Sequence, residues 1–305
     1  MQAFLEDTVN LRREKAEAYR EQVRFLRERL AFYVAEHPNF VLLKMLHFGS
    51  LAKATAISTL REMDVAVYMR EGEARTRDLS TLLPSIRDLL IRVYPQMDTS
   101  QFVIDPPAVT ITYRDSGLNV DVVPVIPNGK PDDRGILPLS YPNWIETSIP
   151  LHLDFIRRRA AKYSRFREVV RLTKWWRQEL DVPLSSFAIE LIWAHLCDGG
   201  FVPDDLQEAM LGFFAYVERS RLGDRIVFAD NYPASEAVVS TSPVQIVDPV
   251  TPNNNVVAYV TSADRDAIVR AAEAALDNVA AGSSAYSKSN GVICYQRVFG
   301  DSFAA

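Results

Sequence analysis

Apolar and polar residues recur with two different periods along the chain, and the change of period divides it into two regions. The first region begins with a helical period from about Phe4 to Glu36, where an apolar residue returns about once a turn among Arg and Glu. We expect His37 and Pro38 to end this helix, because proline disfavours helical backbone in the residue before it. A long N-terminal helix is therefore predicted.

Runs rich in β-branched and aromatic residues follow and are typical of strands. We expect strands at residues 40–48, 63–69, 101–104, 109–113 and 118–125, with a helix from Thr76 to Tyr94 among them. A loop rich in Pro, Gly and Asp, residues 127–142, comes next. The pattern then becomes helical, at about residues 148–159, 164–180, 185–197, 203–219 and 263–281. We therefore predict two domains, 1–147 and 148–305, in an α+β chain whose first domain holds a mixed sheet with helices.

Composition supports a globular protein and limits its partners. The chain has 305 residues, 48% of them hydrophobic, and a net charge of −5. Cys197 and Cys294 lack the spacing of a disulfide framework or a zinc site. No apolar run approaches the ~18 residues that a spanning helix needs, and the N-terminus lacks the order of a signal peptide. We expect a cytoplasmic protein that does not enter membranes.

The densest basic run is Arg157-Arg158-Arg159, with further Lys and Arg residues after it. On a helix such a run is usually a solvated face. An acidic protein needs a strong local patch of Lys and Arg to bind a polyanion. Duplex nucleic acid is therefore not an expected partner.

Three carboxylates in two apolar strands carry the strongest chemical signal. Glu62 and Asp64 share one face of a predicted strand, because successive side chains point to opposite sides. Asp121 lies in another apolar run, where an unpaired carboxylate would be costly to bury. Three such ligands suit two Mg²⁺ ions that clamp the attacking and leaving oxygens of a phosphoryl transfer. Carboxylates solvated on the rim of an ordinary domain are the alternative.

A Gly-Ser pair, Gly49-Ser50, precedes these carboxylates. Glycine allows close backbone approach, and the serine adds a hydroxyl to the backbone N–H groups that a phosphate can accept from. Gly-Ser, then Glu62-x-Asp64, then an isolated Asp121 in a hydrophobic strand resembles the signature of the polymerase β-like nucleotidyltransferase superfamily.

The second region contributes three further motifs, each with a structural alternative. Lys174 flanks an apolar helical stripe and could be a surface lysine whose stem covers that stripe. Ser186 and Phe187 open a helix, where a hydroxyl can serve as an ordinary cap or meet a phosphate. Asp248 to Asn254 form a turn bracketed by prolines, and a purely structural turn is the simplest interpretation.

The order of these motifs resembles two related families. Asp-Pro-x-x-Pro-x-Asn-Asn, Arg-Leu-x-Lys-Trp-Trp and Ser-Phe-Ala-Ile-Glu-Leu resemble the C-terminal domain of the oligoadenylate synthase family. With the Gly-Ser pair and the carboxylates, the chain from about residue 10 to 305 is similar to the bacterial cGAS/DncV-like nucleotidyltransferases, the cyclic oligonucleotide synthases of antiphage CBASS systems. The resemblance implies a polymerase β-like core and an oligoadenylate-synthase-like helical domain, joined by the long N-terminal helix.

The resemblance also implies roles for single residues. Glu62, Asp64 and Asp121 would be catalytic and would hold two Mg²⁺ ions, with Mn²⁺ as a substitute. The implied nucleotide-binding residues are Gly49, Ser50, Lys53, Lys174, Ser186, Phe187, Asp248 and Asn254, of which Phe187 would stack on the donor base.

The implied reaction joins nucleoside triphosphates, ATP among them, into a cyclic di- or trinucleotide with release of pyrophosphate. A linear oligoadenylate synthase, a tRNA-end transferase and a pseudoenzyme that only binds nucleotide are the alternatives. The family further implies a HORMA-domain protein as activator, and we expect the enzyme to be a monomer. The related animal cyclic GMP-AMP synthases carry a Cys/His zinc insertion that is missing from this chain, which again argues against activation by duplex nucleic acid.

Overall fold

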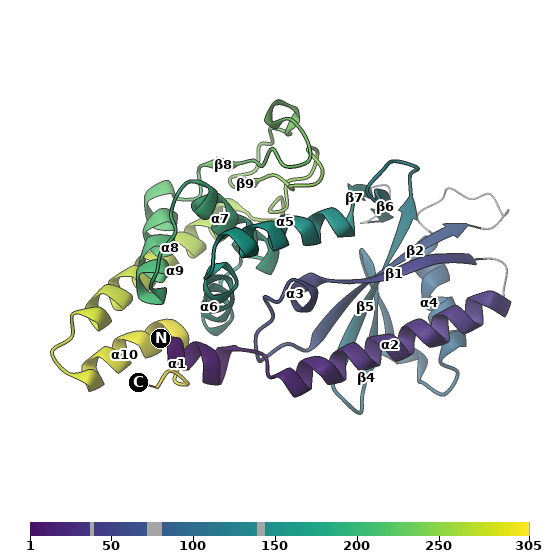
Figure 1. Ribbon diagram of the computed structural model, residues 1–305, viewed down its shortest axis with the longest axis horizontal. Helices are drawn as coiled ribbons and strands as arrows, with labels where there is room; N and C mark the ends of the chain where they lie inside the picture. The colour runs from purple at the N-terminus through teal and green to yellow at the C-terminus, as the bar shows by residue number, and fades with distance from the viewer. Residues whose placement is uncertain (37–39, 72–80, 139–143, 305) are drawn as a thin grey trace. The chain divides into compact units, whose positions relative to one another are not determined.

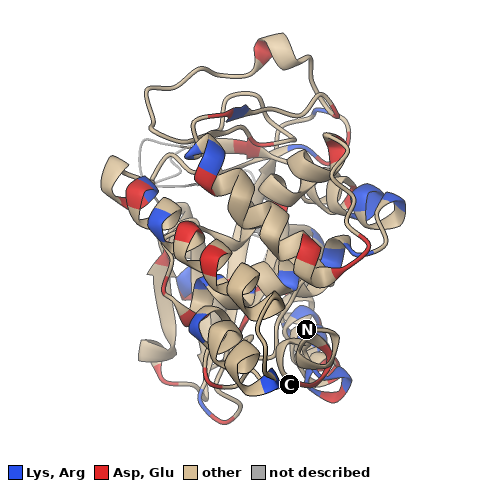
Figure 2. Cartoon of the chain, turned by 90° about the vertical axis from the view of Figure 1, so that its left-hand side faces the viewer, with Lys and Arg blue, Asp and Glu red and all other residues tan. Residues whose placement is uncertain are grey.

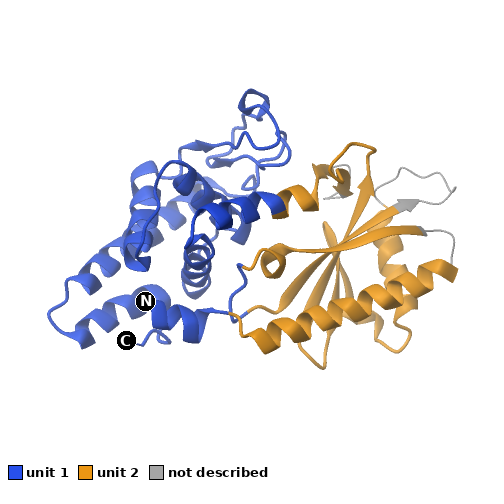
Figure 3. Ribbon diagram, viewed as in Figure 1, with its two compact units in different colours: residues 1–10, 55–59, 154–305 blue, residues 11–54, 60–153 orange. Residues whose placement is uncertain are grey.

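The structure is a computed structural model that describes residues 1–36, 40–71, 81–138 and 144–304 (Figure 1). It contains two compact units (Figure 3). Unit 1 comprises residues 1–10, 55–59 and 154–305, and unit 2 comprises residues 11–54 and 60–153. The predicted domain boundary at 147/148 lies six residues before the point where the chain passes from unit 2 to unit 1, at 153/154. The inclusion of residues 1–10 and 55–59 in unit 1 was not expected.

Unit 2 is built on a mixed sheet. Within the described residues it has seven strands, with the order β1-β2-β5-β4-β3 and with β6 and β7 continuing from β5. β2 and β5 are parallel, and the other neighbours are antiparallel. The strands are β1 (Phe40–Phe48), β2 (Glu62–Glu71), β3 (Phe102–Asp105), β4 (Ala108–Tyr113), β5 (Leu118–Pro127), β6 (Gly135–Pro138) and β7 (Trp144–Thr147).

Helices complete unit 2. α2 (Arg13–Glu36) packs on β1 and β2, and α4 (Leu82–Val93) packs on β3, β4 and β5. The helical turn α3 (Gly49–Ala52) lies between β1 and β2, and the turn η2 (Thr99–Gln101) lies between α4 and β3. α4 forms one apolar stripe because its buried residues recur every three or four positions; they are Leu82, Leu83, Ile86, Leu89, Leu90 and Val93. These elements confirm the predicted mixed sheet with helices.

Unit 1 is mostly helical. Its main helices are α6 (Phe166–Glu179), α7 (Ser186–Asp198), α8 (Leu206–Ser220), α9 (Ser262–Ser283) and α10 (Lys288–Phe299), together with most of α5 (Ile149–Lys162). Short elements complete it: α1 (Gln2–Phe4), the π-helical turn η1 (Leu5–Val9), η3 (Ala234–Glu236) and the two-residue strands β8 (Arg225–Ile226) and β9 (Gln245–Ile246). α10 was not predicted from the sequence.

The core of unit 1 joins residues that are far apart in the chain. The Phe4 ring lies 5.8 Å from the rings of Trp175 and Phe299 and 4.8 Å from that of Phe303. Trp175 Nε1 donates a hydrogen bond of 2.8 Å to the Phe299 carbonyl. The N-terminal segment, α6 and the end of the chain therefore share one apolar cluster.

Two sequence predictions need correction. The single helix expected from Phe4 to Glu36 is interrupted, because Asn10 adopts an extended conformation (φ −68°, ψ 134°) after η1. The apolar period continues through the break because apolar residues on both sides are buried. Phe4 and Val9 are buried in unit 1, whereas the apolar face of α2 is buried in unit 2. The loop expected at 127–142 contains β6. The predicted stop at His37 and Pro38 lies outside the described residues. None of the helices described is long and apolar enough to cross a membrane.

Candidate active site

The three predicted metal ligands lie on the two parallel strands of unit 2. Asp64 of β2 is the direct register partner of Asp121 of β5, and Glu62 is the partner of Asn119. Register partners in neighbouring strands point to the same face of a sheet, and Glu62 is two residues from Asp64. The backbone therefore places all three carboxylates on one face. Glu62 is exposed, whereas Asp64 and Asp121 are half-buried.

Asp121 has a neighbourhood that disfavours its charge. Thr110 Oγ1, on the adjacent strand β4, donates a hydrogen bond of 2.6 Å to Asp121 Oδ1. Burial raises the pKa of the Asp121 carboxyl, the Thr110 bond opposes this, and the negative charge of Asp105 adds to it. A cation at this position would favour the ionised form.

The donor set suits a hard divalent cation, because carboxylate oxygens are the ligands that Mg²⁺ prefers. Among the described residues, no three His, Cys, Asp or Glu side chains are close enough together to form a metal site as they stand. The shared face and the raised pKa of Asp121 fit a cation, so the proposed ligands stay a prediction that the register supports.

The Gly-Ser pair stands directly against one of these carboxylates. Gly49 follows β1 with φ +67°, a left-handed conformation that favours glycine. A Cβ atom added to Gly49 would lie 1.7 Å from Asp64 Oδ2, far inside contact distance. Ser50 is half-buried in the same turn, and the Lys53 N–H donates 3.2 Å to the Gly49 carbonyl. The fold thus joins Gly49 and Asp64 by a contact that the sequence did not reveal.

Ser186 and Phe187 begin α7 in unit 1, as predicted. Ser185 is the N-cap residue, and its hydroxyl accepts a hydrogen bond of 3.1 Å from the Ala188 N–H. The Ser185 N–H in turn donates 2.8 Å to the hydroxyl of Tyr259. Phe187 is half-buried against the core of unit 1. Ser185 therefore serves as the cap, and Ser186 is the next hydroxyl of the same helix end.

Lys174 is not the surface lysine of the alternative interpretation. Its side chain is only 3% exposed, and Nζ lies 2.6 Å from Glu190 Oε1 of α7, which is 2% exposed. Nζ also donates to the Thr55 hydroxyl at 2.9 Å and to the Thr55 carbonyl at 3.3 Å. The sequence analysis missed Glu190, although its position among Ala188, Ile189 and Leu191 could have indicated a buried acid that needs a cation. Triphosphate binding by Lys174 stays a prediction.

Asp248 and Asn254 close a turn on each other. Asp248 is buried, and its carboxylate accepts hydrogen bonds from the Val250 N–H at 2.8 Å and from Asn254 Nδ2 at 3.1 Å. The Asp248 N–H donates to the Asn254 carbonyl at 2.9 Å. These bonds are those of a structural turn, and nucleotide contact by either residue stays a prediction.

The basic run on α5 is not a uniformly solvated face, so that prediction is wrong for Arg159. The Arg159 side chain is 9% exposed and pairs with Asp198 at 2.6 Å and Asp230 at 2.9 Å. Its guanidinium also lies 3.6 Å from the centre of the Phe155 ring. Arg157, by contrast, is 76% exposed. This run therefore offers fewer free cations to a polyanion than its sequence suggests.

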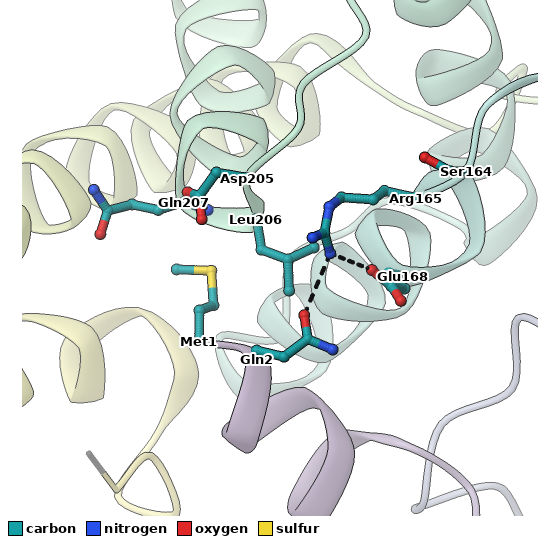
Figure 4. A pocket seen from close by; sticks show the side chains of 8 residues that line it. All are labelled: Met1, Gln2, Ser164, Arg165, Glu168, Asp205, Leu206 and Gln207. Atoms are coloured by element: carbon teal, nitrogen blue, oxygen red, sulfur yellow. Dashed lines mark hydrogen bonds and ion pairs between the residues drawn. The ribbon is translucent and has the colours of Figure 1, made fainter.

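A polar cavity of about 680 Å³ opens elsewhere on unit 1 (Figure 4). Arg165 lies at its wall and donates to Glu168 at 2.8 Å, to Gln2 at 3.3 Å and to the Asp204 carbonyl at 2.5 Å. No predicted site residue lines this cavity. Its main cation is already bonded to protein groups, so we assign it no part in the site.

Comparison with known proteins places the chain in a family. It is 43% identical over 98% of its length to a cyclic AMP-AMP-AMP synthase of Escherichia coli strain MS 115-1, of which it covers 95%. The chain belongs to the CBASS oligonucleotide cyclases. A CBASS oligonucleotide cyclase CdnC of Escherichia coli strain KTE188 is 31% identical over 88% of this chain and 86% of that protein. No model of a known protein family matches the sequence.

Solved structures agree with this membership. The chain matches Escherichia coli MS115-1 CdnC with ATP at a TM-score of 0.88 and 43% identity, over 100% of this chain and 98% of that one. It matches CdnC in a complex with HORMA-deltaN at a TM-score of 0.89, with 100% and 97% covered. The Vibrio cholerae DncV cyclic AMP-GMP synthase shares the fold at a TM-score of 0.73 and 15% identity, with 100% and 95% covered. The resemblance inferred from the motifs of this cyclase is confirmed.

Proposed function

We propose that this cyclase converts ATP into cyclic AMP-AMP-AMP, with release of pyrophosphate, as a signal in CBASS antiphage defence. The observation that carries the proposal is the 43% identity to a cyclic AMP-AMP-AMP synthase along 98% of the chain. In each transfer a sugar hydroxyl of one nucleotide forms a bond to the α-phosphorus of another, and the bond to pyrophosphate breaks. Three such transfers close a ring.

The residues of unit 2 have distinct tasks in this proposal. Glu62, Asp64 and Asp121 would hold two Mg²⁺ ions, or Mn²⁺ in their place. Such ions supply charge stabilisation at the attacking and leaving oxygens. Gly49 leaves room beside Asp64, and the turn that it begins offers N–H groups and the Ser50 hydroxyl to a phosphate. Catalysis would consist of positioning and electrostatic stabilisation, because phosphoryl transfer demands little covalent chemistry of the protein.

In unit 1 we assign Ser186 to phosphate binding and Phe187 to stacking on the donor base. Stacking gives affinity with little discrimination among bases, since every base has an aromatic face. A HORMA-domain protein is the proposed activator, supported by the complex of such a domain with the CdnC relative.

Incubation with labelled ATP, GTP, CTP and UTP, followed by mass analysis of the products, tests the reaction. We expect a cyclic triadenylate that forms only when Mg²⁺ or Mn²⁺ is added, with the enzyme alone or together with a purified HORMA-domain protein. Linear oligoadenylate would favour the linear synthase. ATP binding without product under all these conditions would favour the pseudoenzyme.

Substitution of Phe187 tests the base contact. Phe187→Ala should weaken ATP binding by about 1–3 kcal/mol, and Phe187→Tyr should be tolerated. If Phe187 served only the core, the alanine variant would instead lose about 3–5 kcal/mol of stability. Melting temperature and ATP affinity measured together separate these roles. A large drop in melting temperature with unchanged affinity would reject the stacking role.

A further inference from the structure

The short segment Thr55–Thr59 connects two groups of candidate site residues. The chain leaves unit 2 after Ala54 and returns to it at Leu60 (Figure 3). Before the segment lies the turn from Gly49 to Lys53, and after it β2 begins with Glu62. The segment itself belongs to unit 1. The attachment of the segment to unit 1 therefore affects the Gly49–Lys53 turn that precedes it and the start of β2 that follows it.

A buried charged network holds the first residue of the segment. Thr55 is fully buried, and its hydroxyl donates 2.8 Å to Glu190 Oε1 while it accepts 2.9 Å from Lys174 Nζ. The Thr55 carbonyl accepts a second bond from Nζ at 3.3 Å, and Nζ is 2.6 Å from Glu190. An ammonium group has three N–H donors, and these three acceptors match them.

Other contacts hold the rest of the segment. Ile57 forms an antiparallel bridge with Asn10. The Ser58 N–H donates to the Val9 carbonyl at 2.8 Å, and the Ser58 hydroxyl donates to the Thr8 carbonyl at 2.6 Å. Thr59 Oγ1 donates 2.6 Å to Gln178 Oε1 of α6. Four of the five residues are thus fixed by polar contacts within unit 1, and the segment cannot shift without breaking several of them.

The pair Lys174–Glu190 and Thr55 depend on one another. A buried ion pair is stable only when hydrogen bonds satisfy its remaining donors and acceptors. Thr55 supplies two of the three acceptors around Nζ and a donor to Glu190. Removal of the Thr55 hydroxyl would therefore weaken the network from both sides, and neutralisation of Glu190 would leave a buried cation beside Thr55.

Backbone strain marks the point where the segment joins the turn. Ala54 has φ +57°, a left-handed conformation that is strained for a residue with a side chain. Such conformations persist where the surrounding structure fixes them. Ala54 lies between Lys53 and the anchored Thr55, so the anchor helps to hold the strained residue and the direction of the chain beside it.

We propose that Thr55, Lys174 and Glu190 are positioning residues for nucleotide transfer. They fix the segment Thr55–Thr59 and thereby the course of the chain as it leaves the Gly49–Lys53 turn and enters β2 at Glu62. The inference rests on the proposed function, because it assumes that this turn and β2 serve the reaction. It gives Lys174 an effect through Thr55 in addition to any contact with phosphate.

Thr55→Val tests the proposal, since valine keeps the shape of threonine and removes the hydroxyl. We expect kcat/KM for ATP to fall about 10- to 100-fold, as small misplacement near a reacting group does, with an increase in KM. Thr55→Ser restores the hydroxyl and should recover most of the activity. Assays are run at a temperature where circular dichroism shows every variant folded.

Thr173→Val is the matched control. Thr173 is also fully buried in unit 1, and its hydroxyl donates to the Val169 carbonyl and accepts from Trp193 Nε1, both at 2.8 Å. We expect both valine variants to melt at lower temperature, but only Thr55→Val to change the kinetics. Equal kinetic effects in both valine variants, or a Thr55→Ser variant as impaired as Thr55→Val, would overturn the proposal.

Hydrogen exchange provides a readout that does not need turnover. In Thr55→Val and in Glu190→Gln the amides of residues 49–60 should exchange faster than in the unchanged protein, while Thr173→Val should leave them as they are. Unchanged exchange in both variants would refute the anchor even if the enzyme is active. If the unchanged protein makes no cyclic product but the variants show the expected faster exchange, the proposed function is rejected and the anchor is not.

Discussion

Buried charge is treated in opposite ways in the two units of this cyclase. In unit 1 two buried cations have partners of opposite sign: Lys174 meets Glu190, and Arg159 meets Asp198 and Asp230. In unit 2 two carboxylates, Asp64 and Asp121, are register partners. Burial and the nearby charge of Asp105 raise the pKa of Asp121. The first arrangement brings opposite charges together, and the second brings together two carboxylates whose ionised forms a cation would favour.

The largest expected effect comes from removing one charge of the acidic group. Asp64→Asn or Asp121→Asn should lower cyclic product by about 10³-fold or more, because a metal site is worth several kcal/mol of charge stabilisation. Product formation per folded molecule is the measurement. Asp115→Asn, an exposed residue of a turn in unit 2, is the control. Near-normal product from either variant would reject the shared metal site.

The raised pKa of Asp121 predicts how the stability of the protein depends on pH, and Asp121→Asn tests this dependence. Because the Asp121 pKa is raised in the folded protein, the folded state binds the proton more tightly than the unfolded chain does. The tighter proton binding by Asp121 contributes to the free energy of unfolding. This contribution is fully present below about pH 4, near the ordinary pKa of an Asp, and is lost as the pH rises through the raised pKa. Asp121→Asn should therefore melt higher than the unchanged protein at pH 7 without metal, and the difference should vanish near pH 4. A constant difference would contradict this.

In unit 1 the corresponding experiment removes a buried positive charge instead of a negative one. Arg159→Met leaves two carboxylates without their buried partner and should destabilise the protein by about 3 kcal/mol, as measured by denaturant unfolding. Arg157→Met, at an exposed position of the same helix, should change stability by no more than about 0.5 kcal/mol. Equal effects would show that the buried network contributes no special stability.

Gly49→Ala sharpens the comparison at one contact. The added methyl group would overlap Asp64 Oδ2, and the resulting displacement should cost about 10²-fold in activity. Gly117→Ala is a matched control, since Gly117 has φ +65° and no atom within 4 Å of its added Cβ. Both variants carry the same backbone strain. Comparable activity in the two would mean that the close approach to Asp64 is unimportant.

The smallest expected effect is that of duplex nucleic acid, which should leave the rate unchanged. Figure 2 shows basic and acidic residues interspersed along the helices, and the net charge is −5. Long duplex DNA or RNA at physiological salt is compared with none, and product is measured. A many-fold rise that is lost when Arg157 and Arg158 are changed to Glu, with the buried Arg159 left in place, would contradict this prediction.

The sequence predicted local structure better than contacts between distant segments. Alternation from Met63 to Met69 is a local signal, and the strand formed where expected. The pairing of Asp64 with Asp121 depends on strand order, which alternation does not determine. For a similar reason Glu190 was missed and Arg159 was expected to be solvated. A charged residue in a helix cannot be recognised as buried from the sequence until its partner is known. The break at Asn10 was hidden, since buried residues continue on both sides of it.

The aromatic cluster around Phe4 has a consequence for the making of the protein. Phe4 is separated along the chain from its partners Phe299 and Phe303 by almost 300 residues. The core of unit 1 can therefore close only after all the residues between these partners have been synthesised, and contacts of such wide sequence separation form slowly. Until then the N-terminal segment exposes its apolar residues. The nascent chain thus completes this aromatic cluster only once Phe303 has been synthesised.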